Sequence, residues 1–103
     1  MTNTIWRFDI DTIDDTVDVD MRADLVRWLH AEPHGSTGVT VWAEVEPVIG
    51  TRTSRVYVRG TGHPMTGDEG THIGTVVTIS GLVWHIFADD LPIDDLEPEY
   101  EGN

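Results

Sequence analysis

Hydrophobic and polar residues alternate along most of the first 88 residues, which is the period-two pattern of half-buried β-strands. Residues that favour turns, mainly glycine, proline and aspartate, separate the alternating runs. The runs predict strands at Thr4–Ile10, Thr16–Asp20, Val39–Glu46, Arg52–Arg59, His72–Ser80 and Leu82–Phe87. We therefore predict an all-β fold, a small antiparallel barrel or sandwich of about six strands.

Residues 21–30 fit two patterns. Met21, Leu25 and Trp28 are spaced like the buried stripe of a helix, with Asp20 as its N-cap. The same stretch also alternates as a strand does, and the short strands on both sides favour that interpretation. We predict a strand here, followed by a loop over Glu32–Gly38, where proline and glycine cluster.

Two predicted strands have compositions that indicate their place in the sheet. Leu82–Phe87 is almost entirely apolar, as a central strand is. Thr16–Asp20 alternates valine with aspartate, and charged side chains are typical of a protected edge. Between strands, Thr61–Thr71 is a glycine-rich loop longer than a hairpin needs, and such loops are frequently functional.

The chain carries a net charge of −13 at pH 7. Residues 88–103 hold seven acids and no base, so we predict a β domain over 1–88 and an acidic, solvated tail over 89–103. The net charge argues against non-specific binding to nucleic acid or to a membrane surface. Cysteines, long apolar runs and a signal-peptide pattern are all absent, so we expect a protein of a reducing cytosol.

The six positive side chains are all arginine, and three of them lie in an acid-free segment between Pro47 and Gly67. Arg55, Tyr57 and Arg59 alternate there with valines that would face the core, which places the three side chains on one face of a strand. Arginine grips phosphate or carboxylate with two parallel hydrogen bonds, so this face predicts an anion site.

A glycine-rich turn follows this strand directly. Glycine lets successive backbone N–H groups converge into an anion-binding nest, and a histidine adds an imidazole. The predicted ligand-binding residues are Arg55, Tyr57, Arg59, Gly60, Gly62 and His63. The predicted ligand is a small anion, of which a nucleotide is one example. The alternative interpretation is a solvated strand face followed by an ordinary Gly-Pro loop.

The pattern predicts neither a catalytic nor a metal site. The five histidines lack the short spacings of metal ligands. The serines lie in no nucleophile motif, and the paired aspartates fall in turns or in the tail, where carboxylates stay solvated. We expect a non-catalytic protein without a cofactor.

Two short motifs, Gly60-Thr-Gly-His-Pro64 and Trp84-His-Ile-Phe87, carry a resemblance to a known family. With the segments Trp42–Pro47 and Ile73–Thr75, they resemble a family of short proteins of unknown function from tailed phages and prophages. The resemblance covers most of residues 4–88 and does not extend to the acidic tail. It implies a phage accessory protein that acts in the host cytoplasm.

Capture of a small anionic ligand is the function we expect, in a homo-oligomer suggested by exposed aromatic residues and the apolar last strand. For a phage protein, that ligand could be a nucleotide immune signal of the host. The alternatives are an acidic decoy that occupies the nucleic-acid-binding surface of a host protein, and a virion or assembly component. We expect no direct binding to nucleic acid or to a membrane.

Overall fold

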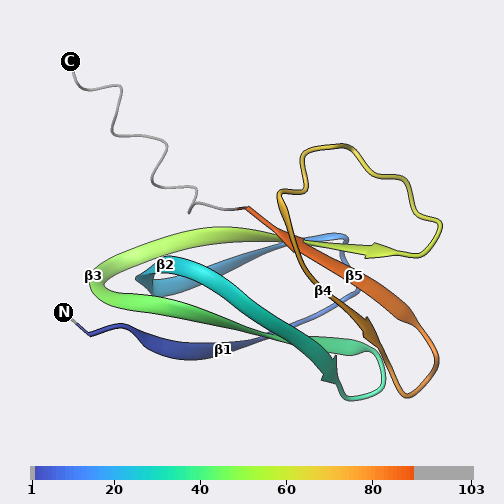
Figure 1. Cartoon of the computed structure of the whole chain (residues 1–103), viewed down its shortest axis with the longest axis horizontal. Coiled ribbons are helices and arrows are strands. Elements are labelled where there is room, and N and C mark those ends of the chain that lie inside the picture. The colour runs from blue at the N-terminus through green and yellow to red at the C-terminus, as the bar shows by residue number, and fades with distance from the viewer. Residues whose placement is uncertain (1, 90–103) are drawn as a thin grey trace.

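The computed structural model describes residues 2–89, and within them the chain forms five β-strands and no helix. The strands are β1 (Thr4–Ile10), β2 (Thr16–His34), β3 (Gly38–Gly60), β4 (Thr71–Val77) and β5 (Val83–Ala88). All pairings are antiparallel, in the order β1-β3-β5-β4, and β2 pairs with β3 off this path. The sheet curls into a half-barrel (Figure 1), so the predicted all-β fold is confirmed. The predicted tail lies outside the described residues from residue 90 onward.

The strands β2 and β3 form one long hairpin that folds back on itself. Midway along it, residues 48–51 of β3 lie opposite Arg22 alone. An unequal bulge of this kind bends both strands, and Figure 1 shows β3 turning back at that end of the molecule. Consequently β1 pairs with the first half of β3 and β5 with its second half.

This hairpin joins strands that the alternation pattern separates. The predicted strands Thr16–Asp20 and 21–30 are parts of one strand, as are Val39–Glu46 and Arg52–Arg59. The prediction of strand for residues 21–30 is confirmed. The period-two pattern breaks at the bend because the bulge changes which side of the backbone faces the core.

The predicted loop over Glu32–Gly38 is wrong in extent. Strand β2 continues to His34, and only residues 35–37 form the turn. Proline is compatible with this stretch because β2 pairs with β3 only, so its other edge needs no donor from Pro33. The position of β2 at an edge also agrees with its acidic alternation.

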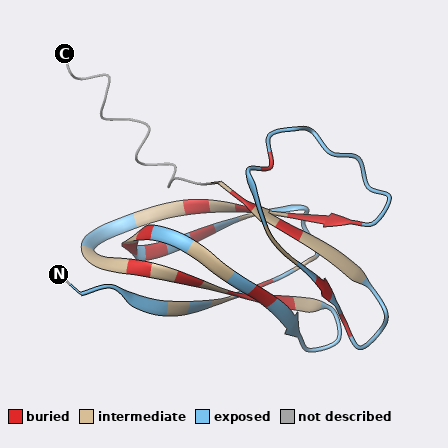
Figure 2. Cartoon of the chain, in the orientation of Figure 1, coloured by how far each residue is buried: buried red, intermediate tan, exposed pale blue. Residues whose placement is uncertain are grey.

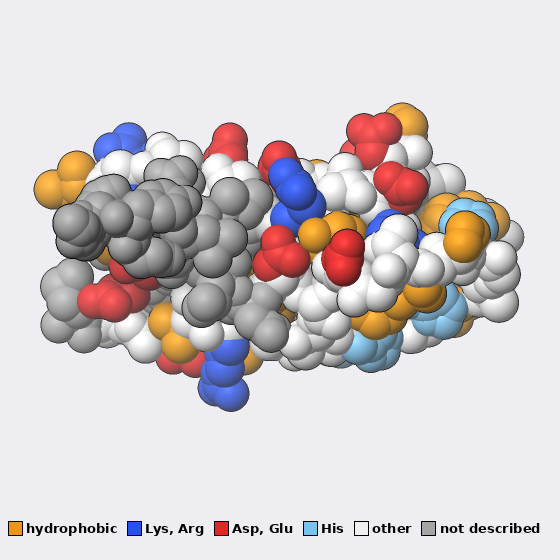
Figure 3. Space-filling model, turned by 90° about the horizontal axis from the view of Figure 1, so that it is seen from above, with side chains coloured by type: hydrophobic (Ala, Val, Ile, Leu, Met, Phe, Trp, Pro, Cys, Tyr) orange, Lys and Arg blue, Asp and Glu red, His pale blue; other side chains and the backbone are white. Residues whose placement is uncertain are grey.

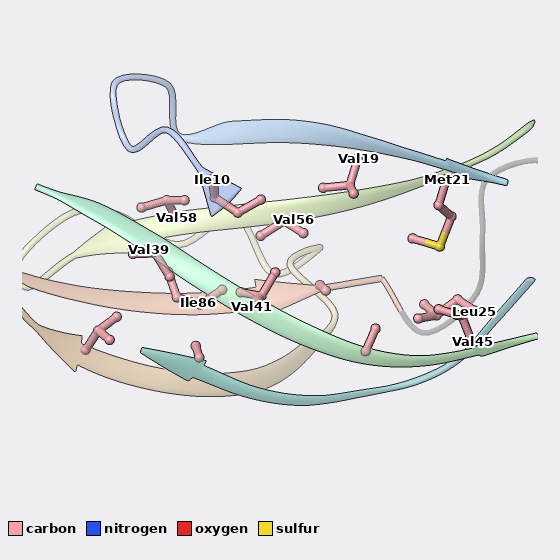
Figure 4. Packing of buried hydrophobic residues seen from close by; sticks show 14 of the residues in the cluster. Ile10, Val19, Met21, Leu25, Val39, Val41, Val45, Val56, Val58 and Ile86 are labelled. Atoms are coloured by element: carbon pink, nitrogen blue, oxygen red, sulfur yellow. The ribbon is translucent and has the colours of Figure 1, made fainter. Parts of the chain in front are cut away.

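The core lies between the two halves of the folded hairpin. Val39, Val41, Ala43 and Val45 on the first half of β3 are fully buried, as the alternation predicts. Figure 4 shows Val39 and Val41 close to Val56 of the second half and Ile86 of β5, and Figure 2 shows the buried positions banded along the strands. Burying a valine or isoleucine side chain fully stabilises the fold by about 1.5–3 kcal/mol, so this alternating set holds the two layers together.

A bulge also changes the faces of β4. The pairing with β5 shifts between His72 and Gly74, so the alternation predicted from His72 to Ser80 is wrong beyond that point, and the strand ends at Val77. Val76 is buried, whereas Val77 is 60% and Ile79 is 90% exposed. The strand β5 lies between β3 and β4, which confirms its predicted central place.

Candidate ligand-binding site

The arginines of the predicted anion site are paired with acids of their own fold. Arg55 Nε lies 2.8 Å from Asp18 Oδ1, and Arg52 Nε lies 2.8 Å from Asp24 Oδ1. Asp18 lies directly opposite Arg55 in the β2–β3 register, so the pairing follows from the ladder itself. The hydrogen bond from Arg55 to Asp18 raises the pKa of Arg55 above its ordinary value.

Arg59 is buried and has a structural role. Its Nε donates to Glu69 Oε2 at 3.2 Å, and its Nη1 donates to the carbonyl oxygen of Asp15 at 2.7 Å. It therefore ties the loop between β3 and β4 and the turn between β1 and β2 to the same strand. An arginine in this position fixes two loops and presents little charge to solvent.

Glu69 organises the loop between β3 and β4 from a position that is only 2% exposed. Its carboxylate accepts hydrogen bonds from the N–H of Thr66 at 2.7 Å and of Gly67 at 2.9 Å. These hydrogen bonds, with that of the Thr66 N–H the strongest, lower the pKa of Glu69 to about 2. Glu69 is thus ionised at neutral pH and remains a partner for Arg59.

Tyr57 is also engaged within the fold. Its hydroxyl donates to Asp89 Oδ1 at 3.2 Å, and its ring lies 5.4 Å from the Arg59 guanidinium carbon. Burial, with the charge of Asp89 adding to it, raises the pKa of Tyr57. Arg55, Tyr57 and Arg59 belong to one strand as predicted, but each has a hydrogen-bond partner within the fold. Ligand binding by these three residues stays a prediction.

The glycine-rich turn closes on itself. The N–H of Gly60 donates to His63 Nδ1 at 3.0 Å, and the N–H of His63 donates to the carbonyl oxygen of Gly60 at 2.9 Å. Two of the N–H groups predicted to form a nest are therefore engaged internally. Gly62 has a φ of 93°, a conformation that favours glycine at this turn.

A hollow of about 310 Å³ adjoins this turn. Its lining comes from the turn and from the β4–β5 connection, namely Gly60, Thr61, His63, Gly81, Leu82, Val83 and Trp84. Of the predicted ligand-binding residues, Gly60 and His63 line this hollow. Because His63 Nδ1 accepts a hydrogen bond, the proton of the neutral ring is on Nε2. Ligand binding at Gly60, Gly62 and His63 stays a prediction.

Histidines and hydroxyls also connect strands β4 and β5. His85 Nε2 lies 2.9 Å from Thr61 Oγ1 and its Nδ1 lies 3.1 Å from Thr75 Oγ1. Thr75 Oγ1 in turn lies 3.1 Å from His72 Nε2. Within residues 2–89, no group of three or more His, Cys, Asp or Glu side chains is arranged to hold a metal ion.

Arg22 differs from the other arginines. Among the described residues, which include all six arginines, it makes no ion pair and no hydrogen bond. The five others pair with Asp9, Glu44, Asp24, Asp18 and Glu69. Arg22 has no acid opposite it because it sits at the bend of the hairpin, facing residues 48–51.

A hollow lies beside Arg22. It has a volume of about 490 Å³ and is lined by Trp6, Phe8, Asp20, Met21, Arg22 and Thr51. The half-buried rings of Trp6 and Phe8, which alternate on β1, and the buried Met21 give it an apolar floor. Small-ligand sites of about 300–1,000 Å³ with apolar walls and few polar groups are common in proteins.

Sequence reasoning did not single out this hollow. Asp20 and Asp24 flank Arg22 at a spacing of two, which suggests that Arg22 is neutralised by its neighbours. In the fold, Asp20 accepts a hydrogen bond from Thr53 and Asp24 pairs with Arg52. Only the strand register shows that Arg22 is unpaired.

One protein family matches the chain over residues 1–95, and it is described as a domain of unknown function (DUF7352). No curated protein and no solved structure matches the chain. This match confirms that the chain belongs to a family of unknown function. Within residues 2–89, no helix is long and apolar enough to cross a membrane.

Proposed function

We propose that this chain, which belongs to the DUF7352 family, is a non-catalytic binding protein that captures a small anion with a planar, largely apolar body. The observation that carries the proposal is the unpaired Arg22 in the lining of the hollow of about 490 Å³. An arginine without a carboxylate partner keeps the N–H donors of its guanidinium group available for phosphate or carboxylate.

The floor of the hollow suits the body of such a ligand. Trp6 and Phe8 give the hollow an aromatic lining, and a base stacked on an aromatic side chain gains about 1–3 kcal/mol. Asp20 also lines the hollow, and its carboxylate opposes ligands that carry several negative charges. A nucleoside monophosphate combines these features, whereas a polyanion would be repelled by the net charge of −13.

The phage context is part of the proposal. The motifs Gly60–Pro64 and Trp84–Phe87 support an accessory protein that acts in a host cytoplasm. A protein without catalytic groups that retains a nucleotide would act by sequestering it, so its effect would depend on affinity and on the amount of protein. A nucleotide immune signal of the host would be a ligand of this class.

Isothermal titration calorimetry with the four ribonucleoside 5′-monophosphates tests the proposal. We expect at least one of them to bind, and we expect inorganic phosphate and the matching nucleoside each to bind more weakly than the intact nucleotide. Arg22→Gln should weaken binding by about tenfold or more, because it removes a charge-assisted hydrogen-bonded pair. Arg55→Gln is the matched control and should leave the affinity unchanged.

Two outcomes would overturn the proposal. One is the absence of binding by all four nucleotides. The other is equal loss of affinity in Arg22→Gln and Arg55→Gln, which would assign the effect to net charge instead of to the hollow beside Arg22. Circular dichroism of each variant shows that the fold is retained, and both side chains lie at the surface.

A further inference from the structure

Two segments at one end of the molecule carry no charged side chain, although the chain has a net charge of −13. We call residues 60–63 and 77–84 the uncharged end, because these two segments contain no Asp, Glu, Lys or Arg. The two segments meet around the hollow that His63, Leu82 and Trp84 line. Figure 3 shows hydrophobic and histidine side chains gathered toward this end of the molecule.

Large apolar side chains are exposed at the uncharged end. Ile79 is 90%, Val77 is 60% and Leu82 is 43% exposed. Single exposed hydrophobic residues are ordinary on protein surfaces. Here, however, three of them lie within six residues of one another, beside a hollow and without a charged neighbour in the same segment. The centre of a protein–protein interface has the same composition, because it is poor in charged residues and rich in apolar ones.

The turn that carries Ile79 is held in place. Thr78 is buried, its N–H donates to the carbonyl oxygen of Leu82 at 2.9 Å, and the N–H of Gly81 donates to the carbonyl oxygen of Thr78 at 2.9 Å. The Ser80 hydroxyl donates to the carbonyl oxygen of Ser36 at 2.8 Å, which fixes the turn to the β2–β3 connection. Ile79 is therefore presented to solvent by a braced turn, and little conformational freedom remains to be lost on docking.

We propose that a second copy of this chain docks on the uncharged end, with Ile79 of each copy packing into the hollow of the other. A two-fold interface must be self-complementary, so that a projection and its recess lie on the same surface. The uncharged end meets this condition. The exposed Ile79 lies two residues before Gly81 and three before Leu82 in the chain, and both of these line the hollow of about 310 Å³.

Charge favours this surface over others for self-association. Two copies that each carry −13 repel one another wherever carboxylates come together, and the uncharged end contains none. The proposal does not rest on nucleotide capture, because the hollow beside Arg22 has a wholly different lining, drawn from β1, β2 and the bend of β3.

Sedimentation velocity of the full chain at increasing concentration tests this proposal. We expect wild-type protein to pass from the 11.5 kDa monomer to a dimer as its concentration rises. Added salt should favour the dimer, because it screens the repulsion and leaves the apolar contact intact. Ile79→Glu should raise the dimer dissociation constant by about a hundredfold or more, because it places two carboxylates in an apolar contact.

Ile49→Glu is the matched control. Ile49 is 93% exposed and lies at the bend of β3, at the other end of the molecule from the β4–β5 turn (Figure 1). It should leave the dimer dissociation constant unchanged, and both variants should keep the melting temperature of the monomer because neither side chain is packed. A strictly monomeric wild type would overturn the proposal, as would a dimer that Ile79→Glu leaves intact or that Ile49→Glu weakens equally.

Discussion

Arg55 and Arg22 both lie on the long β2–β3 hairpin, yet their surroundings differ. Arg55 lies in the regular part of the ladder, directly opposite Asp18, and the two side chains are 2.8 Å apart. Arg22 lies at the bend, where four residues of β3 face it and none of them is acidic. Net charge along a segment therefore does not show where a binding cation is; the strand register decides which arginines are already neutralised.

The largest effect that follows from this comparison concerns Arg59, the buried member of the paired set. Arg59→Ala should lower the free energy of unfolding by about 3 kcal/mol, because it leaves a buried carboxylate without its partner. Urea denaturation followed by circular dichroism measures this change. A loss no larger than that of Arg55→Ala would contradict the structural role of Arg59.

The next effect is on the pH dependence of stability. The pKa of Glu69 is lowered from 4.5 to about 2, so the folded state favours its carboxylate. The stabilisation is fully present above about pH 4.5 and is lost as the pH falls toward 2. Glu69→Gln should therefore be less stable than wild type at pH 7, and the difference between the two should shrink between pH 4.5 and 2.

Urea midpoints measured across that range check this expectation, with Asp68→Asn as the control. Asp68 is the exposed neighbour of Glu69 in the same loop, so its substitution removes a similar charge without removing the buried hydrogen bonds. Equal pH profiles for the two variants would show that net charge, and not the Glu69 contacts, controls the acid sensitivity.

A smaller effect sharpens the account of the hollow beside Arg22. Asp20 lines it together with Arg22, so its carboxylate opposes the approach of an anion. Asp20→Asn should strengthen nucleotide binding by several fold, because it removes a repulsion of about 1 kcal/mol while keeping a hydrogen-bonding side chain. Calorimetry that gave weaker binding would mean that Asp20 contacts a donor of the ligand and that this contact outweighs the repulsion.

The smallest effect is expected at the exposed pair of Arg55 and Asp18. Both side chains are largely open to solvent, where water and salt screen their attraction. Arg55→Gln and Asp18→Asn should each leave the melting temperature close to that of wild type, and their coupling in a double-mutant cycle should vanish in high salt. A large coupling that persists in salt would mean that the pair is shielded from solvent.

Much of the fold could be predicted from the sequence, because burial of alternate residues leaves a period-two pattern. Val39, Val41, Ala43 and Val45 follow it and are fully buried. The errors occur at the bulges, because one extra residue reverses the face of every residue after it. In β4, the bulge between His72 and Gly74 leaves Val76 buried and Val77 60% exposed.

The candidate site could be predicted only in part. The sequence indicates one acid-free segment with Arg55 and Arg59, but it does not show that Asp18 and Glu69 reach them from distant positions. Conversely, Asp20 and Asp24 beside Arg22 suggest a neutralised arginine, whereas in the fold Asp20 accepts a hydrogen bond from Thr53 and Asp24 pairs with Arg52. The charged residues of a segment could be counted from the sequence, whereas the ion pairs between distant residues could be found only from the strand register.

The most direct test follows the four tryptophan indole N–H signals and the arginine Nε–H signals by NMR during titration with the nucleotide that binds best. The account predicts saturable shifts of Trp6 and Arg22, which line one hollow, while the signals of Trp84 and Arg55 stay in place. Shifts confined to Trp84 and the Gly60–His63 turn would contradict it and would place the ligand at the other hollow.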